Sequence, residues 1–243
     1  MLIVLAVEGI KVCHRTSGPL KLVLPIALLL LTSLSCVRLW AEGRTYVGAL
    51  GGISTLSADH RSEISATSSA ISAYKPENGP TFNVFVGRHL NNYLTVQGTY
   101  GWNRNDLTLG SLSISEAGQN TYEQSRSSSQ HAAFADLLLY FRNLRSRVRP
   151  YLSVGAGWVR LESTAEQLHT VVGSPQLPPA RFVSNAPATR FTVGIDLYAI
   201  KGWAFRYSFS ETIRSNAITS ELVPPGQRGL ANFQNFFGFL KRF

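Results

Sequence analysis

Apolar and polar residues alternate with a period of two over most of the chain after Arg44. This spacing is typical of β-strands that are covered on one face, because successive side chains of a strand point to opposite faces. No window in this region keeps the 3.6-residue spacing of an amphipathic helix. Eight stretches are predicted as strands, namely residues 44–55, 81–89, 93–107, 131–142, 149–162, 189–200, 202–213 and 231–243.

The connections between these stretches alternate strictly between long and short. The long ones, at 56–80, 108–130, 163–188 and 214–230, are rich in Ser, Gly, Asn and Pro, whereas those at 90–92, 143–148 and 200–202 are tight. Long loops therefore lie at one end, and short turns lie with both termini at the other. This asymmetry is typical of outer-membrane barrels. We predict an all-β fold, an eight-stranded antiparallel up-and-down transmembrane β-barrel.

Side-chain bulk indicates which face of each strand points outward. The last strand but one carries two contrasting rows. One row is Trp203, Phe205, Tyr207 and Phe209, and the other is Ala204, Arg206, Ser208 and Ser210. An eight-stranded barrel is only wide enough for side chains to fill it, so we expect the small and polar row inside and the aromatic row toward lipid. The alternative is a soluble, lipocalin-like barrel with the apolar row inside.

Charged residues on the inward rows predict a polar network in the lumen. A three-residue loop at 200–202, with a left-handed Gly202, would place Asp196 directly opposite Arg206. An isolated buried charge is costly, so we expect these two residues to pair. The alternative is that trapped water solvates each charge. Three further polar residues are expected in the same interior: Asp136, Gln97 and Gln234.

The N-terminal segment has the pattern of a secretory signal peptide. Three basic residues precede an apolar block at 22–31, and small polar residues and Ala41 follow it. We predict that residues 1–41 are a signal peptide and that residues 42–243 are the barrel domain. Cleavage there would remove both cysteines, Cys13 and Cys36. Lipidation of Cys36 is the alternative.

Composition narrows the class of protein. The 243 residues are 44% hydrophobic, 11% aromatic and 15% charged, and the aromatic content excludes a disordered chain. Only one apolar run, at 22–37, approaches spanning length, which excludes a polytopic helical membrane protein. The net charge of +9 invites a nucleic-acid partner, but no aromatic residues are interleaved with the densest basic cluster, and the leader directs the chain out of the cytoplasm. That cluster comprises Arg142, Arg145, Arg147 and Arg149. It contacts anionic lipid headgroups or is merely solvated.

The final residues, 232–243, complete a resemblance to a known family. With the leader, the eight strands and the alternation of loop lengths, the chain resembles the small outer-membrane β-barrel family, of which the transmembrane domain of outer membrane protein A is a familiar member. In that family a terminal Phe with apolar residues at alternate positions is recognised by the barrel assembly machinery. The matching positions are Phe233, Phe237, Phe239 and Phe243. Lys241 and Asn235 depart from the pattern. The resemblance implies residence in the bacterial outer membrane, with its lipids and the assembly machinery as partners.

The search for reactive chemistry predicts no active site, cofactor or metal. The five histidines are not spaced as metal ligands. Some barrels of this size are lipid A deacylases with His and Ser on one strand. Here the corresponding strand has Ser208 and Ser210 but no His, and both serines point inward. Glycines at 48–52 and 154–157 lie within predicted strands, where they are expected to relieve crowding or to mark a bulge.

The resulting functional prediction is a non-enzymatic outer-membrane β-barrel with a side-chain-filled lumen. It would act in envelope integrity or in surface interaction through its outer loops. The alternatives are a narrow pore for small polar solutes and, with less support, a lipid A-modifying enzyme.

Overall fold

The computed structural model describes residues 44–58, 60–200, 202–226 and 229–243. The predicted signal peptide, its cleavage site and both cysteines lie outside these residues. The described strands are β1 (Thr45–Ala58), β2 (Arg61–Ile64), β3 (Ser68–Pro76), β4 (Asn78–His89), β5 (Leu94–Ser115), β6 (Gly118–Tyr140), β7 (Val148–Val172), β8 (Arg181–Ile200), β9 (Trp203–Ser215) and β10 (Gly229–Arg242), with a 3₁₀ turn, η2, at Thr219–Glu221. Within these residues, none of the helical segments has the length and apolar character needed to cross a bilayer.

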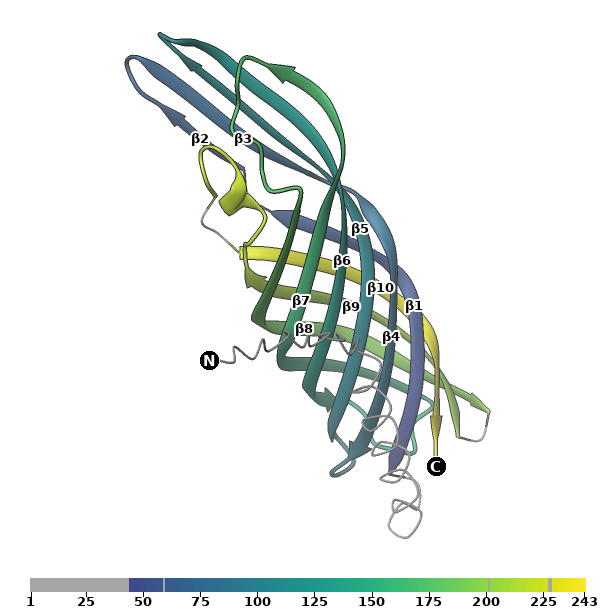
Figure 1. Cartoon of the computed structure of the whole chain (residues 1–243). Coiled ribbons are helices and arrows are strands. Elements are labelled where there is room, and N and C mark those ends of the chain that lie inside the picture. The colour runs from purple at the N-terminus through teal and green to yellow at the C-terminus, as the bar shows by residue number, and fades with distance from the viewer. Residues whose placement is uncertain (1–43, 59, 201, 227–228) are drawn as a thin grey trace, which may run out of the picture. The chain divides into compact units, whose positions relative to one another are not determined.

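Eight of the strands close into a ring. Each pairs antiparallel with its neighbours in the order β1, β4, β5, β6, β7, β8, β9, β10, and β10 returns to β1 with Tyr46 opposite Arg242. In Figure 1 the yellow β10 runs beside the purple β1, so the first and last strands complete the wall. The predicted all-β, eight-stranded, up-and-down antiparallel barrel is confirmed.

The inward and outward rows also agree with the alternation. Along β9, odd-numbered residues from Trp203 to Phe209 are exposed, and even-numbered residues from Ala204 to Ser210 are buried. The same alternation holds on β6 and β8. The apolar row therefore covers the exterior, which excludes the soluble, lipocalin-like alternative. Gly202 has φ +77°, the left-handed conformation predicted for this turn. The predicted three-residue loop is too long, however, because Ile200 already pairs with Trp203 and the register shifts between Tyr198 and Ile200.

The prediction of four long irregular loops is wrong in three places. Residues 56–80 contain the β2–β3 hairpin, β5 and β6 continue to a tight turn at 116–117, and β7 reaches Val172 before β8 begins at Arg181. Figure 1 shows β5, β6 and β7 running with β2 and β3 well past one end of the ring. Along these extensions the outward face meets water instead of lipid, so the outward row need not be apolar. The Ser- and Thr-rich extensions therefore resemble loops in sequence.

Candidate functional site

A bidentate ion pair occupies the lumen near its short-turn end. Asp196 and Arg206 are register partners on β8 and β9. Arg206 donates from Nε to Asp196 Oδ1 at 2.6 Å and from Nη2 to Oδ2 at 2.9 Å. The Tyr140 hydroxyl donates to Asp196 Oδ2 and accepts from Arg206 Nη2, both at 2.8 Å. Both charged side chains are at most 1% exposed, so the pair is a charge-assisted contact shielded from solvent.

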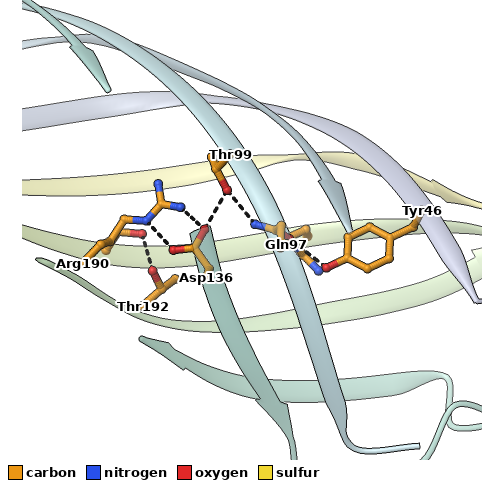
Figure 2. Close-up of polar contacts among 8 residues, drawn as sticks. Tyr46, Gln97, Thr99, Asp136, Arg190 and Thr192 are labelled. Carbon is orange, nitrogen blue, oxygen red and sulfur yellow. Dashed lines mark hydrogen bonds and ion pairs between the residues drawn. The ribbon is translucent and has the colours of Figure 1, made fainter. Parts of the chain in front are cut away.

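Gln97 and Thr99 extend this pair into a longer chain of hydrogen bonds. Gln97 Oε1 accepts from Arg206 Nη1 at 2.9 Å and from the Tyr46 hydroxyl at 2.8 Å. Gln97 Nε2 donates to Thr99 Oγ1 at 3.0 Å, and that hydroxyl donates to Asp136 Oδ2 at 2.8 Å. Figure 2 shows this chain crossing the lumen from Tyr46 to Asp136. We call this connected set the lumen network; its members are Tyr46, Gln97, Thr99, Asp136, Tyr140, Arg190, Asp196 and Arg206.

Arg190 is the partner of Asp136. Its Nε donates to Asp136 Oδ1 at 3.1 Å, and its Nη2 contacts Oδ2; both side chains are buried. Its guanidinium also lies over the Phe134 ring, 4.4 Å from the centroid. Sequence reasoning missed Arg190, although it lies on the same inward row as Asp196. Even-numbered residues on this strand point inward, and this alternation would have predicted Arg190 to lie in the lumen.

A glycine makes the second ion pair possible. Asp136, Gly155 and Arg190 are successive register partners on β6, β7 and β8, so the two charged side chains meet over a residue that has none. A Cβ on Gly155 would collide with Asp136 Oδ1. Gly194 plays the same part beneath Tyr151, whose ring Cζ would lie 2.5 Å from an added Cβ. These inward glycines relieve crowding; the sequence suggested this role, or a bulge, for Gly155 but not for Gly194.

Gln234 lies in the same interior as the lumen network. It is buried and lines a cavity of about 10 Å³ with Asn103, Gln130 and Arg190. A further lumen cavity, beside Asp136 and Arg206, measures about 20 Å³ and also reaches Arg190. Each has room for about one water molecule. Hydrogen bonds therefore connect Asp196, Arg206, Gln97 and Asp136, and Gln234 lies beside Arg190 at the edge of this set.

An apolar cluster covers the long-strand end of the lumen. We call it the cap cluster; its members are Leu56, Tyr74, Leu107, Leu109, Tyr122, Leu161, Ile218, Leu222 and Leu230. Ile218 and Leu222 come from the connection at 216–226, the cap loop, which folds over the barrel. Ser111 Oγ on β5 donates to Val223 O at 2.5 Å, and Arg61 Nη1 on β2 donates to Pro225 O at 3.1 Å. These two hydrogen bonds hold the loop against β5 and β2.

The basic turn cluster divides between two environments. Arg142, Arg145 and Arg147 are exposed, but Arg149 is fully buried inside the barrel. Its guanidinium lies 3.8 Å from the centroid of the Tyr140 ring, and Nη2 donates to Asn92 O at 3.3 Å. The prediction of a four-arginine surface at this turn is therefore wrong for Arg149. Strand β7 begins at Val148, whose side chain points outward, so the side chain of the next residue, Arg149, points into the barrel.

The C-terminal aromatic residues lie on the exterior. Phe237, Phe239 and Phe243 are each more than half exposed. The two departures from the aromatic pattern have aromatic neighbours: Lys241 Nζ lies 5.1 Å from the Trp203 ring centroid, and Asn235 Oδ1 accepts from the Tyr207 hydroxyl at 3.3 Å.

The described residues contain no group of three His, Cys, Asp or Glu side chains placed to bind a metal ion. Ser208 and Ser210, the serines considered for acyl transfer, are buried inward-facing residues at 2% and 3% exposure.

Comparison with known proteins decides the family. Residues 26–223 match the model of the outer membrane protein beta-barrel domain. The chain belongs to this family. It is a bacterial outer-membrane β-barrel, so its aromatic exterior faces lipid, and its long strands extend outside the cell.

Three solved structures resemble this chain, and the first of them supports the same fold. Neisserial surface protein A superposes with a TM-score of 0.51 at 13% identity, covering 83% of this chain and 100% of that protein. OprG from Pseudomonas aeruginosa gives 0.45 at 12% identity, covering 84% and 97%. Ail, the attachment invasion locus protein of Yersinia pestis, gives 0.45 at 13% identity, covering 82% and 99%. At these identities the likeness concerns the fold alone. Comparison with curated protein sequences finds no match.

Proposed function

We propose that this outer-membrane barrel is a non-enzymatic anchor that presents a stiff β-sheet at the cell surface. We call this sheet the platform; it comprises β2, β3 and residues 107–115, 118–126 and 164–172 of β5, β6 and β7. The observation that carries the proposal is its continuity with the wall, since β5, β6 and β7 are 22, 23 and 25 residues long and about 9 to 11 suffice to cross the membrane.

The outward face of the platform has features of an interaction surface. A groove of about 410 Å³ runs over Gly110 on β5, between Lys75 on β3 and Glu123 on β6. Ile71 and Ile114, on the same face, are 45% and 46% exposed. Exposed apolar residues bordered by polar ones favour protein or ligand contact over simple solvation.

The packed lumen supports the proposal over a pore. The lumen network and the cap cluster lie in series along the axis, and the two lumen cavities each have room for about one water. Single-channel recording in planar bilayers tests this point. We expect no conductance steps, and reproducible steps would favour the pore.

An enzyme acting on lipid A would need a nucleophile and base open to the bilayer. Ser208 and Ser210 instead face the lumen. Mass spectrometry of lipid A from cells with and without the gene tests this alternative. Identical spectra are expected, and a gene-dependent change in acylation would overturn the non-enzymatic assignment.

The deciding experiment shortens the platform without touching the barrel. Replacing residues 113–120 by Asn-Gly keeps Leu112 opposite Thr121 and leaves the cap cluster intact. Full-length and shortened proteins in nanodiscs are then compared on arrays of glycans and extracellular proteins. Surface interaction predicts binding that shortening removes, with heat-dependent gel mobility confirming that both variants are folded. Equal binding by both would overturn a role for residues 113–120 and confine any contact to the retained part of the platform, where the groove lies. An envelope role would appear as detergent sensitivity of cells lacking the gene, restored equally by both variants.

We also propose that Phe243 is read by the barrel assembly machinery, as the family resemblance implies. The lipid-facing aromatic residues Phe237 and Phe239 support this proposal. Deleting Phe243 should lower the outer-membrane yield more than deleting the exposed Leu177 in the 173–180 connection. Equal yields would mean that the signal lies elsewhere in the chain.

A further inference from the structure

A groove of about 620 Å³ crosses the lipid-facing wall. Its two sides are adjacent rows of register partners on β6 to β9. One row is Leu137, Val154, Phe191 and Glu211, and the other is Leu139, Leu152, Val193 and Phe209. With Leu94 on β5 at its far end, the groove spans four interstrand spacings, or about 19 Å.

Glu211 is out of place among these side chains. Its outward neighbours along β9 are Phe209 and Ile213, and its register partners are Phe191 on β8 and Phe233 on β10. The carboxylate is partly buried and forms no ion pair with any residue that the structure describes. A charged group on the lipid face is destabilising unless it reaches the interface or a partner.

The position of the groove restricts what fills it. Because the wall faces the bilayer, the occupant is a membrane lipid. The apolar length of the groove fits one acyl chain, and its volume lies within the range of about 300 to 1,000 Å³ of small-molecule sites. Glu211 lies four residues before the end of β9, on the outer side, where it would meet a headgroup.

We infer that this groove binds an outer-leaflet lipid whose headgroup carries a primary ammonium, with one acyl chain along the groove and the ammonium at Glu211. Phosphatidylethanolamine is the simplest probe with this headgroup chemistry. An ammonium supplies both the missing positive charge and N–H donors for a charge-assisted hydrogen bond. The rings of Phe191 and Phe233 beside the carboxylate add cation–π attraction. A phosphatidylglycerol headgroup carries no cation, and a choline headgroup carries no N–H donor.

Native mass spectrometry of the delipidated barrel in detergent micelles tests the inference. The protein is titrated with phosphatidylethanolamine, phosphatidylcholine and phosphatidylglycerol of identical acyl chains, in the presence of EDTA. We expect phosphatidylethanolamine to be retained about tenfold more strongly than phosphatidylglycerol, a difference of about 1.4 kcal/mol. Glu211→Gln should abolish the preference, and Glu211→Lys should reverse it.

Two tryptophan variants separate the groove from the wall in general. Val193→Trp fills the groove and should reduce retention of all three lipids. Val86→Trp, at a lipid-facing site on β4 outside the groove, should leave retention unchanged. Unchanged heat-dependent mobility on gels shows that each variant is folded.

Three results would overturn the inference. They are equal retention of phosphatidylethanolamine and phosphatidylglycerol by the wild type, a choline lipid that binds as well as the ethanolamine lipid, and loss of binding in Val86→Trp as large as in Val193→Trp. Binding of phosphatidylglycerol that appears only when Ca²⁺ replaces EDTA would assign Glu211 to a divalent cation instead.

Discussion

The two ends of the lumen bury their arginines in different ways. Toward the short turns, Arg206 and Arg190 meet carboxylates, Asp196 and Asp136, whereas Arg149, beside the turns themselves, lies over the Tyr140 ring and donates to Asn92 O. Near the outer rim, Arg126 instead donates to neutral oxygens: Nε to Ser163 Oγ at 3.1 Å, Nη1 to Gln124 Oε1 at 2.9 Å and Nη2 to Pro179 O at 2.9 Å. Apolar packing in the cap cluster then excludes water around it.

The difference follows from the surroundings of each end. Within the bilayer an arginine has no solvent beyond the wall, so a buried countercharge offsets much of its desolvation cost. Beyond the bilayer the outer face of the strands contacts water. There, carbonyl and hydroxyl dipoles are sufficient to stabilise the guanidinium of Arg126. Burial still lowers the pKa of Arg126, which indicates that this end also bears a desolvation cost. The lumen network should therefore couple strongly between partners, whereas the cap cluster should respond to lost volume.

The largest expected effect is in the lumen network. Asp196→Asn or Arg206→Gln alone leaves one charge buried without its partner, which should cost about 3 to 5 kcal/mol of unfolding free energy, whereas replacing both should cost less. A double-mutant cycle by urea unfolding in lipid vesicles measures this coupling. The exposed pair Glu162–Arg181 is the control and should couple by about 0 to 1 kcal/mol. Coupling below about 0.5 kcal/mol for the buried pair would indicate that water solvates each charge.

A smaller effect is expected in the cap. Leu222→Ala leaves a void beneath the cap loop and should cost about 2 to 4 kcal/mol, toward the lower part of the range for core leucines because a loop can partly collapse. The readout is the urea concentration at which protease cleaves within 216–226. Leu177→Ala, at a site 42% exposed, should leave it unchanged. No conductance should appear in either variant, because the lumen network still fills the barrel; new channels in Leu222→Ala would show that the cap alone seals it.

Crowding beneath the second ion pair gives a third prediction. Gly155→Ala places a methyl group against Asp136 and should cost about 1 to 3 kcal/mol while weakening the contact with Arg190. Gly98→Ala is the matched control, because its Cβ would have no atom within 4 Å. Equal stability of the two variants in urea would show that the lumen is looser than this packing implies.

The smallest effect concerns the cap tyrosines. The Tyr122 and Tyr74 hydroxyls have no hydrogen-bond partner among the described residues, so replacing both by Phe should change stability at pH 7 by less than about 1 kcal/mol. Burial raises the pKa of Tyr122 to about 12 and also raises the pKa of Tyr74. The unfolded phenols titrate near pH 10, so the neutral buried form confers its stability fully below pH 10 and loses it as the pH rises toward 12.

Protease cleavage of the cap loop between pH 8 and 11.5 measures this loss. Wild-type protein should become sensitive above about pH 10, and the double Phe variant should do so later. Identical profiles would mean that other groups control the alkaline opening.

Period-two alternation by itself determined the number of strands in the ring and which face their side chains take, because side-chain direction in a strand is a local backbone property. The short turn with Gly202 was also needed to place Asp196 opposite Arg206. It predicted less well where the strands leave the bilayer, since β5 to β7 continue without the pattern that lipid imposes.

Only the tertiary structure decided three further features. Arg190 meets Asp136 across an intervening strand because Gly155 leaves the space between them. Gln234 lines a cavity beside Arg190 of the lumen network, and the cap loop folds inward to bury Ile218 and Leu222. Each feature depends on the stagger between neighbouring strands in the closed barrel and on the space that remains in the lumen. Those quantities arise from closure of the whole ring and have no signature in any single strand.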